Sequence, residues 1–449
     1  MKNRISLAVL CLLALAASCD KNESAAPDTI ETGDVETTAF TFTISSTIND
    51  LSAKDIAYGI IGVLYGEADE IDESVFQAWK EGENVKCQKF TRVNSIGNKI
   101  YQAKIEGLKP DKSYLACMYF ESEDNRREIG KPITLTTMPF AAKAVTGQAT
   151  DVYYGCATVP CTLEGILPAD LGGCTYGILL SRQEEPTLAN ATNTHAAVND
   201  DRFEATFNKL SMDTEYHFKP YIHVTSTDSY IYGVTGSFKT RNADDMAVDM
   251  GLSVDWSELY LGAERPGGEG ELYRWGETET ARTDREYIFY NPADGTFDFS
   301  ELGWEINGTR YDAAKSKLGG NWRMPTQSDM KELIANCEIS VYEGKTTEEN
   351  LLVLKSIKNG AKISLPATRY MIWDSDAQRY VVEQPYGNVY FQSSTRTESD
   401  PANEIAEGVV CFASDFDIRY ASTHNKSISI IPVITYLFAL PILPVRDKE

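Results

Sequence analysis

Apolar and polar positions alternate along most of the chain between residues 39 and 240. Short runs rich in β-branched and aromatic residues recur there, and turn-forming residues separate them at intervals. A period of two predicts half-buried antiparallel strands, and strands at this spacing are typical of β-sandwiches of roughly 100 residues. We therefore predict two all-β sandwiches in succession, over residues 39–138 and 139–241.

The two stretches carry an internal repeat. The repeat pairs Leu108-Lys109-Pro110-Asp111-Lys112-Ser113-Tyr114 with Leu210-Ser211-Met212-Asp213-Thr214-Glu215-Tyr216, and Tyr58-Gly59-Ile60 with Tyr176-Gly177-Ile178. The Leu-x-Pro-x-x-x-Tyr pattern resembles the tyrosine corner of fibronectin type III domains, although Met212 replaces the proline in the second copy. The resemblance implies immunoglobulin-like sandwiches in which the hydroxyls of Tyr114 and Tyr216 satisfy backbone groups at a strand crossover. We expect the two modules to act as spacers, and a binding role stays open because a fold does not decide a function.

The C-terminal part is organised around the stretch Gly319-Gly320-Asn321-Trp322-Arg323-Met324-Pro325-Thr326. A short polar link at residues 242–246 separates this part from the second sandwich. The two glycines permit a sharp turn. Pro325 sets φ ahead of a helix start, and Thr326 is a favourable N-cap with an acid, Asp329, three residues later. Apolar residues at helical spacing then predict a helix of roughly three turns, with Met330, Leu333, Ile334 and Cys337 on one face.

Arg323 stands between two large apolar residues, Trp322 and Met324. A guanidinium in such surroundings needs a carboxylate or several carbonyls as partners. We interpret the stretch as a packed corner in which Arg323 pairs with a buried acid. The alternative is that Arg323 is a ligand-binding cation.

Further motifs accompany this stretch in the C-terminal part. They include Asp249-Met250-Gly251-Leu252-Ser253-Val254-Asp255-Trp256, Gly270-Glu271-Leu272-Tyr273-Arg274-Trp275-Gly276-Glu277, Tyr311-Asp312-Ala313-Ala314, the hairpin signal Asn359-Gly360 and Tyr390-Phe391-Gln392-Ser393-Ser394. The ordered series resembles the Fibrobacter succinogenes major paralogous domain (FISUMP) over about residues 246–433. Two positions depart from that family, because Gln392 replaces a tryptophan and Ile430-Ile431-Pro432-Val433 lacks an arginine before Pro-Val.

The Arg-Met-Pro-Thr segment also resembles the Arg-Leu-Pro-Thr segment of formylglycine-generating enzymes, a group related to C-type lectins. This resemblance implies an α+β, C-type-lectin-like fold over residues 246–449, with short irregular strands and one or two helices. It does not imply oxidase chemistry, because no cysteine pair matches that enzyme's active site by local motif. The calcium–sugar triplets of lectins are also missing from the sequence; Gln384-Pro385-Tyr386 comes near one triplet but lacks its final oxygen ligand.

Five of the six tryptophans lie in the C-terminal part. Trp256, Trp275 and Trp322 belong to the motifs, so we predict that they fill the core. Trp304 and Trp373 lie in polar segments that we expect to be loops. We select these two as candidate ligand-binding residues, because aromatic rings stack on the apolar faces of sugars.

The sequence carries no signal for a cofactor or a metal site. The four histidines, His195, His217, His223 and His424, are scattered along the chain, and no Cys or His cluster has zinc spacing. Asp374-Ser375-Asp376 offers too few ligands for calcium and is read as a solvated turn. The cysteines form no recognisable disulfide framework, so we expect most of them to be buried thiols.

The net charge of −24 argues against nucleic acid and anionic membrane surfaces as partners. Residues 1–19 resemble a bacterial lipoprotein signal peptide, with an apolar run too short to span a bilayer and Cys19 as the lipidated residue. Asp20-Lys21-Asn22-Glu23 resembles the export tag of Bacteroidota surface lipoproteins. Residues 20–38 are polar and are read as a flexible tether. We expect a lipid-anchored outer-membrane protein that faces the cell exterior.

Together these features predict a non-catalytic surface lipoprotein that binds a glycan or a surface protein through its C-terminal domain. One alternative is a structural component of a fimbria or surface complex, in which the apolar C-terminal tail, residues 434–449, is donated to a neighbour. A less favoured alternative is a hydrolytic or modifying enzyme that uses paired acids such as Glu277 and Asp312.

Overall fold

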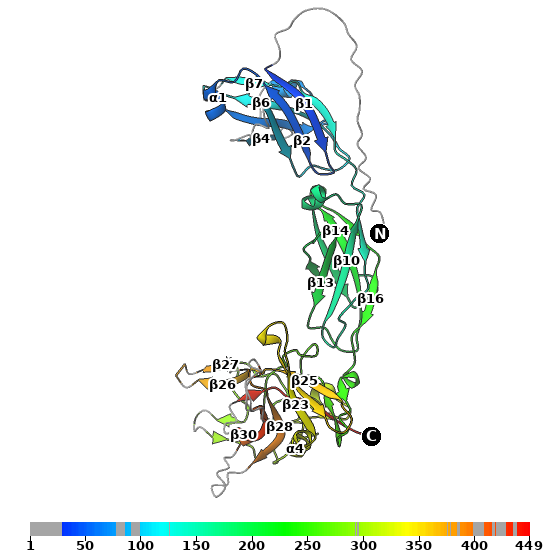
Figure 1. The fold of residues 1–449 in the computed structure, drawn as a ribbon, viewed down its shortest axis with the longest axis vertical. Coiled ribbons are helices and arrows are strands. Elements are labelled where there is room, and N and C mark those ends of the chain that lie inside the picture. The colour runs from blue at the N-terminus through cyan, green and yellow to red at the C-terminus, as the bar shows by residue number, and fades with distance from the viewer. Residues whose placement is uncertain are drawn as a thin grey trace, which may run out of the picture. The chain divides into compact units, whose positions relative to one another are not determined.

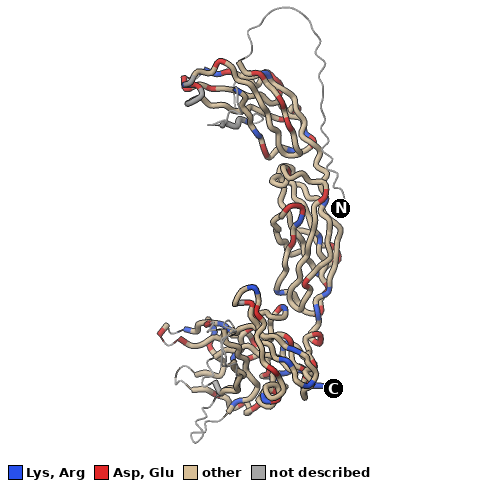
Figure 2. The backbone as a smooth tube through the Cα atoms, in the orientation of Figure 1, with Lys and Arg blue, Asp and Glu red and all other residues tan. Residues whose placement is uncertain are grey.

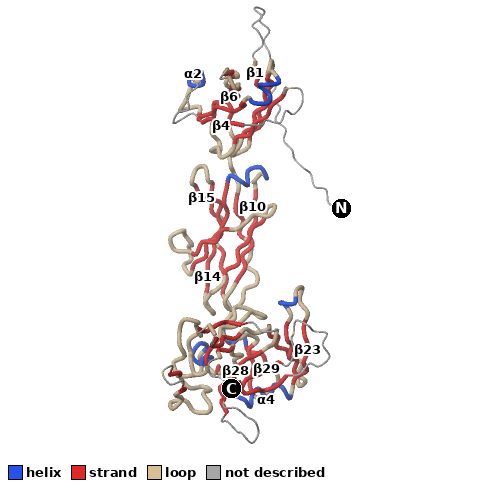
Figure 3. Tube along the Cα trace, turned by 90° about the vertical axis from the view of Figure 1, so that its left-hand side faces the viewer, coloured by secondary structure: helices blue, strands red, loops and turns tan. Residues whose placement is uncertain are grey.

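The computed structural model describes residues 29–77, 86–90, 99–124, 126–291, 293, 296–374, 376–377, 379–383, 387–397, 408–414, 418, 428–433 and 438–449. Small antiparallel sheets dominate these residues and helices are few, so the expectation of a mostly β, multidomain chain is confirmed (Figures 1 and 3). Within the described ranges no helix is long and apolar enough to cross a membrane. The chain divides into two compact units, of which the first consists of Met1–Ala141, Leu167–Gly173 and Thr225–Asp228 and the second of the remaining residues.

The first module contains two sheets that share one core. One sheet has the order β1-β2-β5, with β1 at Ile30–Thr37, β2 at Phe42–Ile48 and β5 at Ile100–Ile105. The other has the order β4-β3-β6-β7, with β4 at Lys86–Phe90, β3 at Ile60–Glu67, β6 at Ser113–Glu121 and β7 at Arg127–Ile129. Strand β8, at Ile133–Thr136, also pairs with β6. Two short helices, α1 at Ala53–Tyr58 and α2 at Ser74–Gln77, complete the module. Phe42 and Ile44 of one sheet and Met118 of the other belong to the same buried cluster.

The predicted tether over residues 20–38 is wrong for its second half. Residues 30–37 form β1, which pairs antiparallel with β2. Polar residues fill most of this strand, but Ile30 is buried in the core of the module and Val35 packs against it. Backbone pairing and these two apolar anchors order a segment whose composition alone suggests a tether.

The second module repeats the arrangement within the second unit. One sheet has the order β13-β10-β9, with β9 at Lys143–Thr146, β10 at Ala157–Glu164 and β13 at Arg202–Phe207; the other has the order β12-β11-β14-β15, with β11 at Cys174–Ser181, β12 at Thr192–His195, β14 at Glu215–Val224, β15 at Ser229–Tyr232, and β16 at Gly236–Lys239 also paired to β14. A 3-10 turn, η1, spans Pro168–Gly173 and belongs to the first compact unit.

Both tyrosine corners contain the contact that their pattern predicts. The Tyr114 hydroxyl accepts a hydrogen bond from the Lys109 amide at 2.9 Å, and the Tyr216 hydroxyl accepts one from the Ser211 amide at 2.9 Å. The second corner therefore forms although Met212 stands at the proline position. The backbone conformation at this corner does not depend on proline.

One part of the proposed sequence repeat is out of register. Gly177 of β11 lies opposite Tyr221 of β14, and its counterpart in the first module is Gly62, which lies opposite Tyr119 of β6. Gly59, which the sequence pairs with Gly177, instead follows the end of α1. A Cβ atom at Gly177 would overlap the Tyr221 ring, so strand packing rather than local pattern selects this glycine.

The C-terminal domain combines several short sheets with two α-helices. One sheet has the order β17-β18-β32-β22, formed in that order by Ala247–Val248, Val254–Ser257, Val445–Asp447 and Trp322–Arg323, and another has the order β19-β31-β26-β27, formed by Tyr273–Arg274, Ala439–Leu440, Tyr370–Asp374 and Arg379–Glu383. Two sheets have three consecutive strands each: β23-β24-β25, at Cys337–Tyr342, Leu351–Ser356 and Lys362–Pro366, and β28-β29-β30, at Tyr390–Thr397, Gly408–Ser414 and Ile428–Val433. The short strands β20 at Tyr290–Asn291 and β21 at Thr296–Phe297 pair with each other. The helices are α3 at Ala313–Leu318 and α4 at Gln327–Ala335, and the 3-10 turns η2 and η3 span Ala243–Met246 and Thr347–Glu349. The Asn359-Gly360 signal lies in the turn between β24 and β25, where Gly360 has φ 79°.

The chain end lies inside this domain. β32 is hydrogen-bonded between β18 and β22, with Val445 opposite both Trp256 and Arg323. Ile442 and Leu443 are fully buried. Of the alternatives open for this tail, a last strand is the one that the structure shows for residues 438–449, and the donated tail is wrong for them, because their apolar side chains complete the core of their own domain. Residues 434–437 lie outside the described part.

Gln392 is a polar residue that is fully satisfied in the interior of the C-terminal domain. Its side-chain amide is buried and donates to the Tyr273 carbonyl at 2.7 Å and to the Leu440 carbonyl at 3.0 Å. The side chain joins β28 to β19 and β31. The core tolerates this amide because two backbone carbonyls converge on it.

The second module and the C-terminal domain are packed against each other within the second unit. Tyr154 is buried in the core of the C-terminal domain, and its hydroxyl donates to Glu258 at 2.6 Å. The Glu264 carbonyl accepts from the amides of Tyr154 and Gly155, at 3.1 and 3.0 Å, and its carboxylate accepts from the Lys209 amide at 2.8 Å. A buried ring and four hydrogen bonds therefore connect these two parts.

Candidate functional site

Trp304 is the most exposed tryptophan that the structure describes, with 44% of its surface accessible. Its carbonyl accepts the Arg396 amide at 2.9 Å, and the Arg396 guanidinium lies over the indole, 4.1 Å from the ring centroid. Arg396 reaches this position because the pairing of β28 with β29 shifts register between Gln392 and Arg396. A guanidinium over an aromatic face is attractive and orients the ring.

A buried aromatic layer supports the same guanidinium. Arg396 also lies 5.0 Å from the Phe299 ring and 5.8 Å from the Trp275 ring. Beside it, the Thr395 hydroxyl donates to Glu305 and accepts from the Gln327 amide at 3.0 Å. We refer to Trp304, Glu305, Thr395 and Arg396 as the Trp304 patch. The sequence contains no local signal for this patch, because its two halves are about 90 residues apart and are joined by tertiary contacts, among them an isolated bridge between Glu305 and Thr395.

Trp373, the other candidate, lies in strand β26 rather than in a loop. It is half-buried, and its ring contacts Tyr380 edge-on at 5.0 Å. The fully buried Arg274 lies over the same tyrosine at 4.3 Å. Trp373 therefore packs against an apolar cluster of its own sheet, and no ring contact joins the described side chains of Trp304 and Trp373. The structure does not bring the two candidates into one site.

The other three tryptophans of the C-terminal motifs occupy the interior. Trp256, Trp275 and Trp322 are each at most 1% exposed. Trp256 contacts Phe391, and Trp275 contacts Phe299 edge-on at 5.8 Å. These rings pack the core and are not available to a ligand.

Arg323 is engaged by acids of its own domain. Its guanidinium donates to Asp329 at 2.7 Å, to Asp447 at 2.9 Å and to the Met324 carbonyl at 3.1 Å. Asp329 is buried and belongs to the N-terminal turn of α4, where Pro325 and Thr326 precede it. These contacts favour the packed-corner interpretation over a ligand-binding cation.

Glu277 and Asp312 are both buried, but each is held by separate partners. Glu277 pairs with Arg285 at 2.8 Å and accepts the Ile288 amide at 3.0 Å. Asp312 caps α3 and accepts backbone amides, including that of Met324 at 3.0 Å. Burial raises the pKa of Asp312, and the amide hydrogen bonds partly oppose this. Both carboxylates thus hold backbone or arginine groups of their own domain in place.

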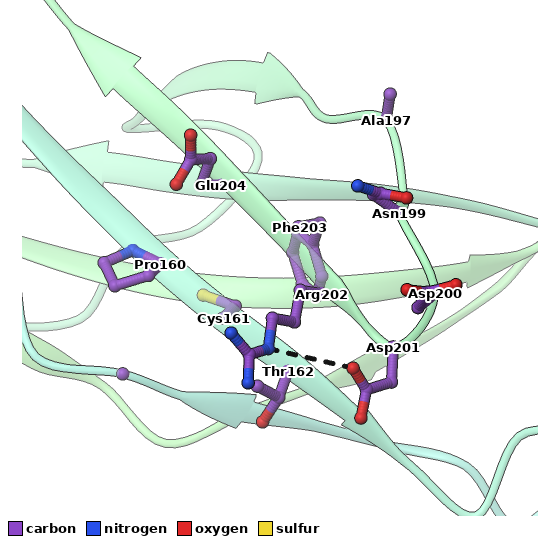
Figure 4. Close-up of a pocket in the computed structure, with 11 residues that line it drawn as sticks. Pro160, Cys161, Thr162, Ala197, Asn199, Asp200, Asp201, Arg202, Phe203 and Glu204 are labelled. Carbon is purple, nitrogen blue, oxygen red and sulfur yellow. Dashed lines mark ion pairs between the residues drawn. The ribbon is translucent and has the colours of Figure 1, made fainter.

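A surface hollow with a volume of about 820 Å³ lies on the second module. Residues of β10, β13 and the preceding loop line it, and Figure 4 shows Arg202 extended beside Asp201. This ion pair measures 3.8 Å, and both side chains are mostly exposed. The hollow is an open surface whose charged groups face solvent. It therefore lacks the enclosed polar groups typical of a small-molecule site.

Metal and thiol chemistry find no support in the described part of the chain. No group of three His, Cys, Asp or Glu residues there could hold a metal ion. Six described cysteines are thiols outside disulfide bonds, and burial raises the pKa of Cys161 and Cys337 to about 11 and that of Cys117 to about 12. Thiols with such pKa values stay protonated and unreactive at neutral pH.

Acidic and basic residues are interspersed along the backbone (Figure 2).

Some of the segments that the sequence singles out lie outside the described residues. They are the signal peptide with Cys19, the first part of the tether, the near-triplet at 384–386 and His424. Ser375, in the middle of the acidic turn, also lies outside.

No protein-family model matches the chain, and no curated protein sequence matches it. Among solved structures, the chain is similar to the sensor domain of the anti-sigma factor RsgI4 of Pseudobacteroides cellulosolvens, with 18% identity over 22% of this chain and 76% of that one and a TM-score of 0.18. A short form of the same sensor domain has 20% identity over 26% of this chain and 100% of that one, also with a TM-score of 0.18. These likenesses cover a small part of the chain, and their TM-scores carry no argument about function. The FISUMP resemblance stays a prediction.

Proposed function

We propose that the protein is a non-catalytic cell-surface binding protein whose C-terminal domain recognises a glycan through the Trp304 patch. The observation that carries the proposal is an exposed indole held against the guanidinium of Arg396 at 4.1 Å. A ring fixed in this way loses little conformational freedom when a ligand stacks on it. Arg396 and Glu305 add charged hydrogen-bonding groups beside the apolar surface, a combination that suits the amphipathic faces of sugars.

The proposal also includes the family to which each domain of the chain is assigned. The repeated hydrogen bonds of Tyr114 and Tyr216 support two fibronectin type III-like modules. The helix that follows the Arg-Met-Pro-Thr segment supports a FISUMP-like, C-type-lectin-like domain after them. Lipidation at Cys19, an outer-membrane location and the absence of a nucleic-acid partner rest on the sequence alone.

A structural role in a fimbria or surface complex is the second candidate. It can no longer use residues 438–449 as a donated strand, because they pair within their own domain. A surface protein as the ligand of the Trp304 patch remains compatible with the exposed ring.

A glycan array probed with the full chain tests the proposal. We expect retention on a subset of glycans and a loss of about five- to thirtyfold in affinity in Trp304→Ala, because stacking on a sugar contributes on the order of 1–2 kcal/mol. Tyr342→Ala is the matched control, since Tyr342 is an exposed aromatic residue (60%) of β23 in the same domain. Unchanged glycan binding by a folded Trp304→Ala variant would sink the proposal. Capture of a cell-surface protein without any glycan would favour the second candidate.

A further inference from the structure

Three histidines that are scattered in the sequence lie on one face of the larger sheet of the second module. His195 comes from β12, and His217 and His223 come from β14. His195 and Tyr221 both lie opposite Gly177 of β11. Successive side chains of a strand point to opposite faces, so these residues share the face that points away from the buried side chains of Phe218, Ile222 and Val224.

Two tyrosines of β15 extend this face towards the sheet edge. Tyr230 lies opposite His223, and Tyr232 lies opposite Tyr221. The rings of His223 and Tyr230 stack at 4.4 Å with 19° between their planes, and those of Tyr230 and Tyr232 lie 5.9 Å apart at 13°. We call Tyr221, His223, Tyr230 and Tyr232 the tyrosine strip. Tyr232 is 43% exposed, so the strip reaches solvent at the sheet edge.

Polar groups border the tyrosine strip. The Tyr221 hydroxyl donates to Asn193 at 2.9 Å and lies 3.4 Å from a ring nitrogen of His195. The Lys219 ammonium lies 5.8 Å from the Tyr232 ring and pairs with Glu185 at 2.9 Å. The lysine charge is thus balanced, and the border offers mostly neutral donors and acceptors although the whole chain has a net charge of −24.

The first module shows what this face contains when it has only a packing role. Tyr119, the counterpart of Tyr221, is fully buried there. It belongs to an apolar cluster with Leu115 and Cys117 of β6 and with Phe76 of α2, which covers the face. At the positions of Leu115 and Cys117 the second module has His217 and Lys219, each 102 residues later, the same offset as between Tyr119 and Tyr221.

The two modules therefore use one position of the same fold differently. In the first module, apolar residues and a helix close the face. In the second module, aromatic and hydrogen-bonding side chains take the place of that apolar cover. Tyr221 is itself buried (1% exposed), and the strip becomes accessible through the half-buried Tyr230 and the exposed Tyr232 at the sheet edge. An apolar cover would stabilise the sheet more. Stability alone does not account for that replacement, and recognition of a ligand does.

We propose that the tyrosine strip binds a neutral oligosaccharide. Parallel aromatic rings suit the apolar C–H surfaces of sugars, and Asn193, His195 and His223 suit their hydroxyl groups. A protein–protein interface usually has an apolar centre made of several side chains. In the tyrosine strip Tyr232 is the large exposed side chain, so the exposed apolar surface is too small for such a centre. The balanced charge of Lys219 and Glu185 favours an uncharged ligand over an acidic one.

This site is separate from the Trp304 patch and does not depend on it. The test is affinity electrophoresis of the full chain in gels containing a neutral glucan, mannan or galactan, with an acidic polysaccharide in parallel. We expect retardation by at least one neutral polysaccharide and a loss of tenfold or more in apparent affinity in the double variant Tyr230→Ala/Tyr232→Ala. The control Tyr58→Ala removes an exposed tyrosine (67%) of the first module and should bind as the unmodified chain does.

Two further measurements keep the outcomes distinct. Thermal unfolding must show that the double variant is folded, and His223→Ala offers a milder change with an expected loss of threefold or more. Loss of neutral-glycan binding in the tyrosine variants but not in Trp304→Ala supports the strip and counts against the Trp304 patch. The reverse pattern overturns the strip and leaves the proposed function standing. Absence of neutral-glycan binding, or binding of the acidic polysaccharide alone, also overturns the strip.

Discussion

The guanidinium of Arg323 donates to one carboxylate oxygen of Asp329 at 2.7 Å, and the same oxygen accepts the amide and the hydroxyl of Thr326 at 2.8 Å each. The Asp329 amide in turn donates to the Thr326 hydroxyl at 3.1 Å, which completes a capping box. One buried carboxylate therefore both starts α4 and neutralises the arginine that stands between Trp322 and Met324.

Asp329→Asn should destabilise the C-terminal domain by about 3 kcal/mol. The change weakens the cap and leaves a largely buried guanidinium with one partner fewer. Asp447→Asn is the control, because Asp447 is half-exposed and should contribute less than about 1 kcal/mol. Denaturant unfolding followed by tryptophan fluorescence measures both. Equal effects of the two changes would show that the capping role of Asp329 is minor.

Deleting residues 445–449 should abolish cooperative unfolding of the C-terminal domain. The deletion removes β32 from between β18 and β22, so that β22 loses its strand partner and β18 stays paired only with β17. Deleting only Lys448 and Glu449 is the control; it removes a surface ion pair of Lys448 with Asp249 and should cost less than about 1 kcal/mol. Calorimetry distinguishes the two, and a cooperative transition in the longer deletion would contradict the central placement of β32.

Gly177→Ala should destabilise the second module by about 2 kcal/mol. The added methyl group would overlap the Tyr221 ring, so the ring must tilt and lose its hydrogen bond to Asn193. Gly172→Ala is the matched control, since nothing lies within 4 Å of the added atom. Thermal unfolding of both variants checks this, and an unchanged transition in Gly177→Ala would mean that Tyr221 is not held where the structure places it.

Stability should fall with rising pH above about pH 10, and less steeply in Tyr154→Phe. Burial and the contact with Glu258 raise the pKa of Tyr154 in the folded chain above its ordinary value of 10.0. The unfolded chain therefore releases this proton first, and the free energy of unfolding decreases as pH rises until the folded tyrosine also ionises. The difference in slope between the two proteins should approach about 1.4 kcal/mol per pH unit. Denaturant unfolding across this range measures it, and parallel slopes would contradict the buried hydroxyl.

Arg396→Ala should weaken glycan binding at the Trp304 patch by roughly two- to fivefold, because a cation–π contact at an exposed site contributes about 0.5–1 kcal/mol. The emission of Trp304, isolated as a difference from Trp304→Phe, should shift to longer wavelength as the ring gains contact with water. Arg310→Ala removes a comparable contact over Tyr311 and should change neither property. Unaltered emission in Arg396→Ala would show that the guanidinium does not order the indole.

Local features were predictable because a few neighbouring residues determine them. Alternation indicated the strands of both sandwiches, and the repeated tyrosine pattern indicated two corners that close with the same hydrogen bond. Thr326 and Asp329 indicated the start of α4, and Asn359-Gly360 indicated the hairpin of β24 and β25. Each of these depends on backbone geometry within a few residues.

The sequence by itself therefore determined the mostly β character, the internal repeat and the caps and turns of this protein. The tertiary structure alone decided which distant segments meet. It ordered the polar strand β1 through pairing with β2, inserted the last strand into the centre of its sheet, and brought Arg396 onto Trp304. It also selected Gly62 as the counterpart of Gly177 in the repeat, and it placed three scattered histidines on the sheet face that carries Tyr230 and Tyr232. Strand partners and register depend on packing between residues far apart in the chain, and periodicity within one strand carries no information about its neighbours.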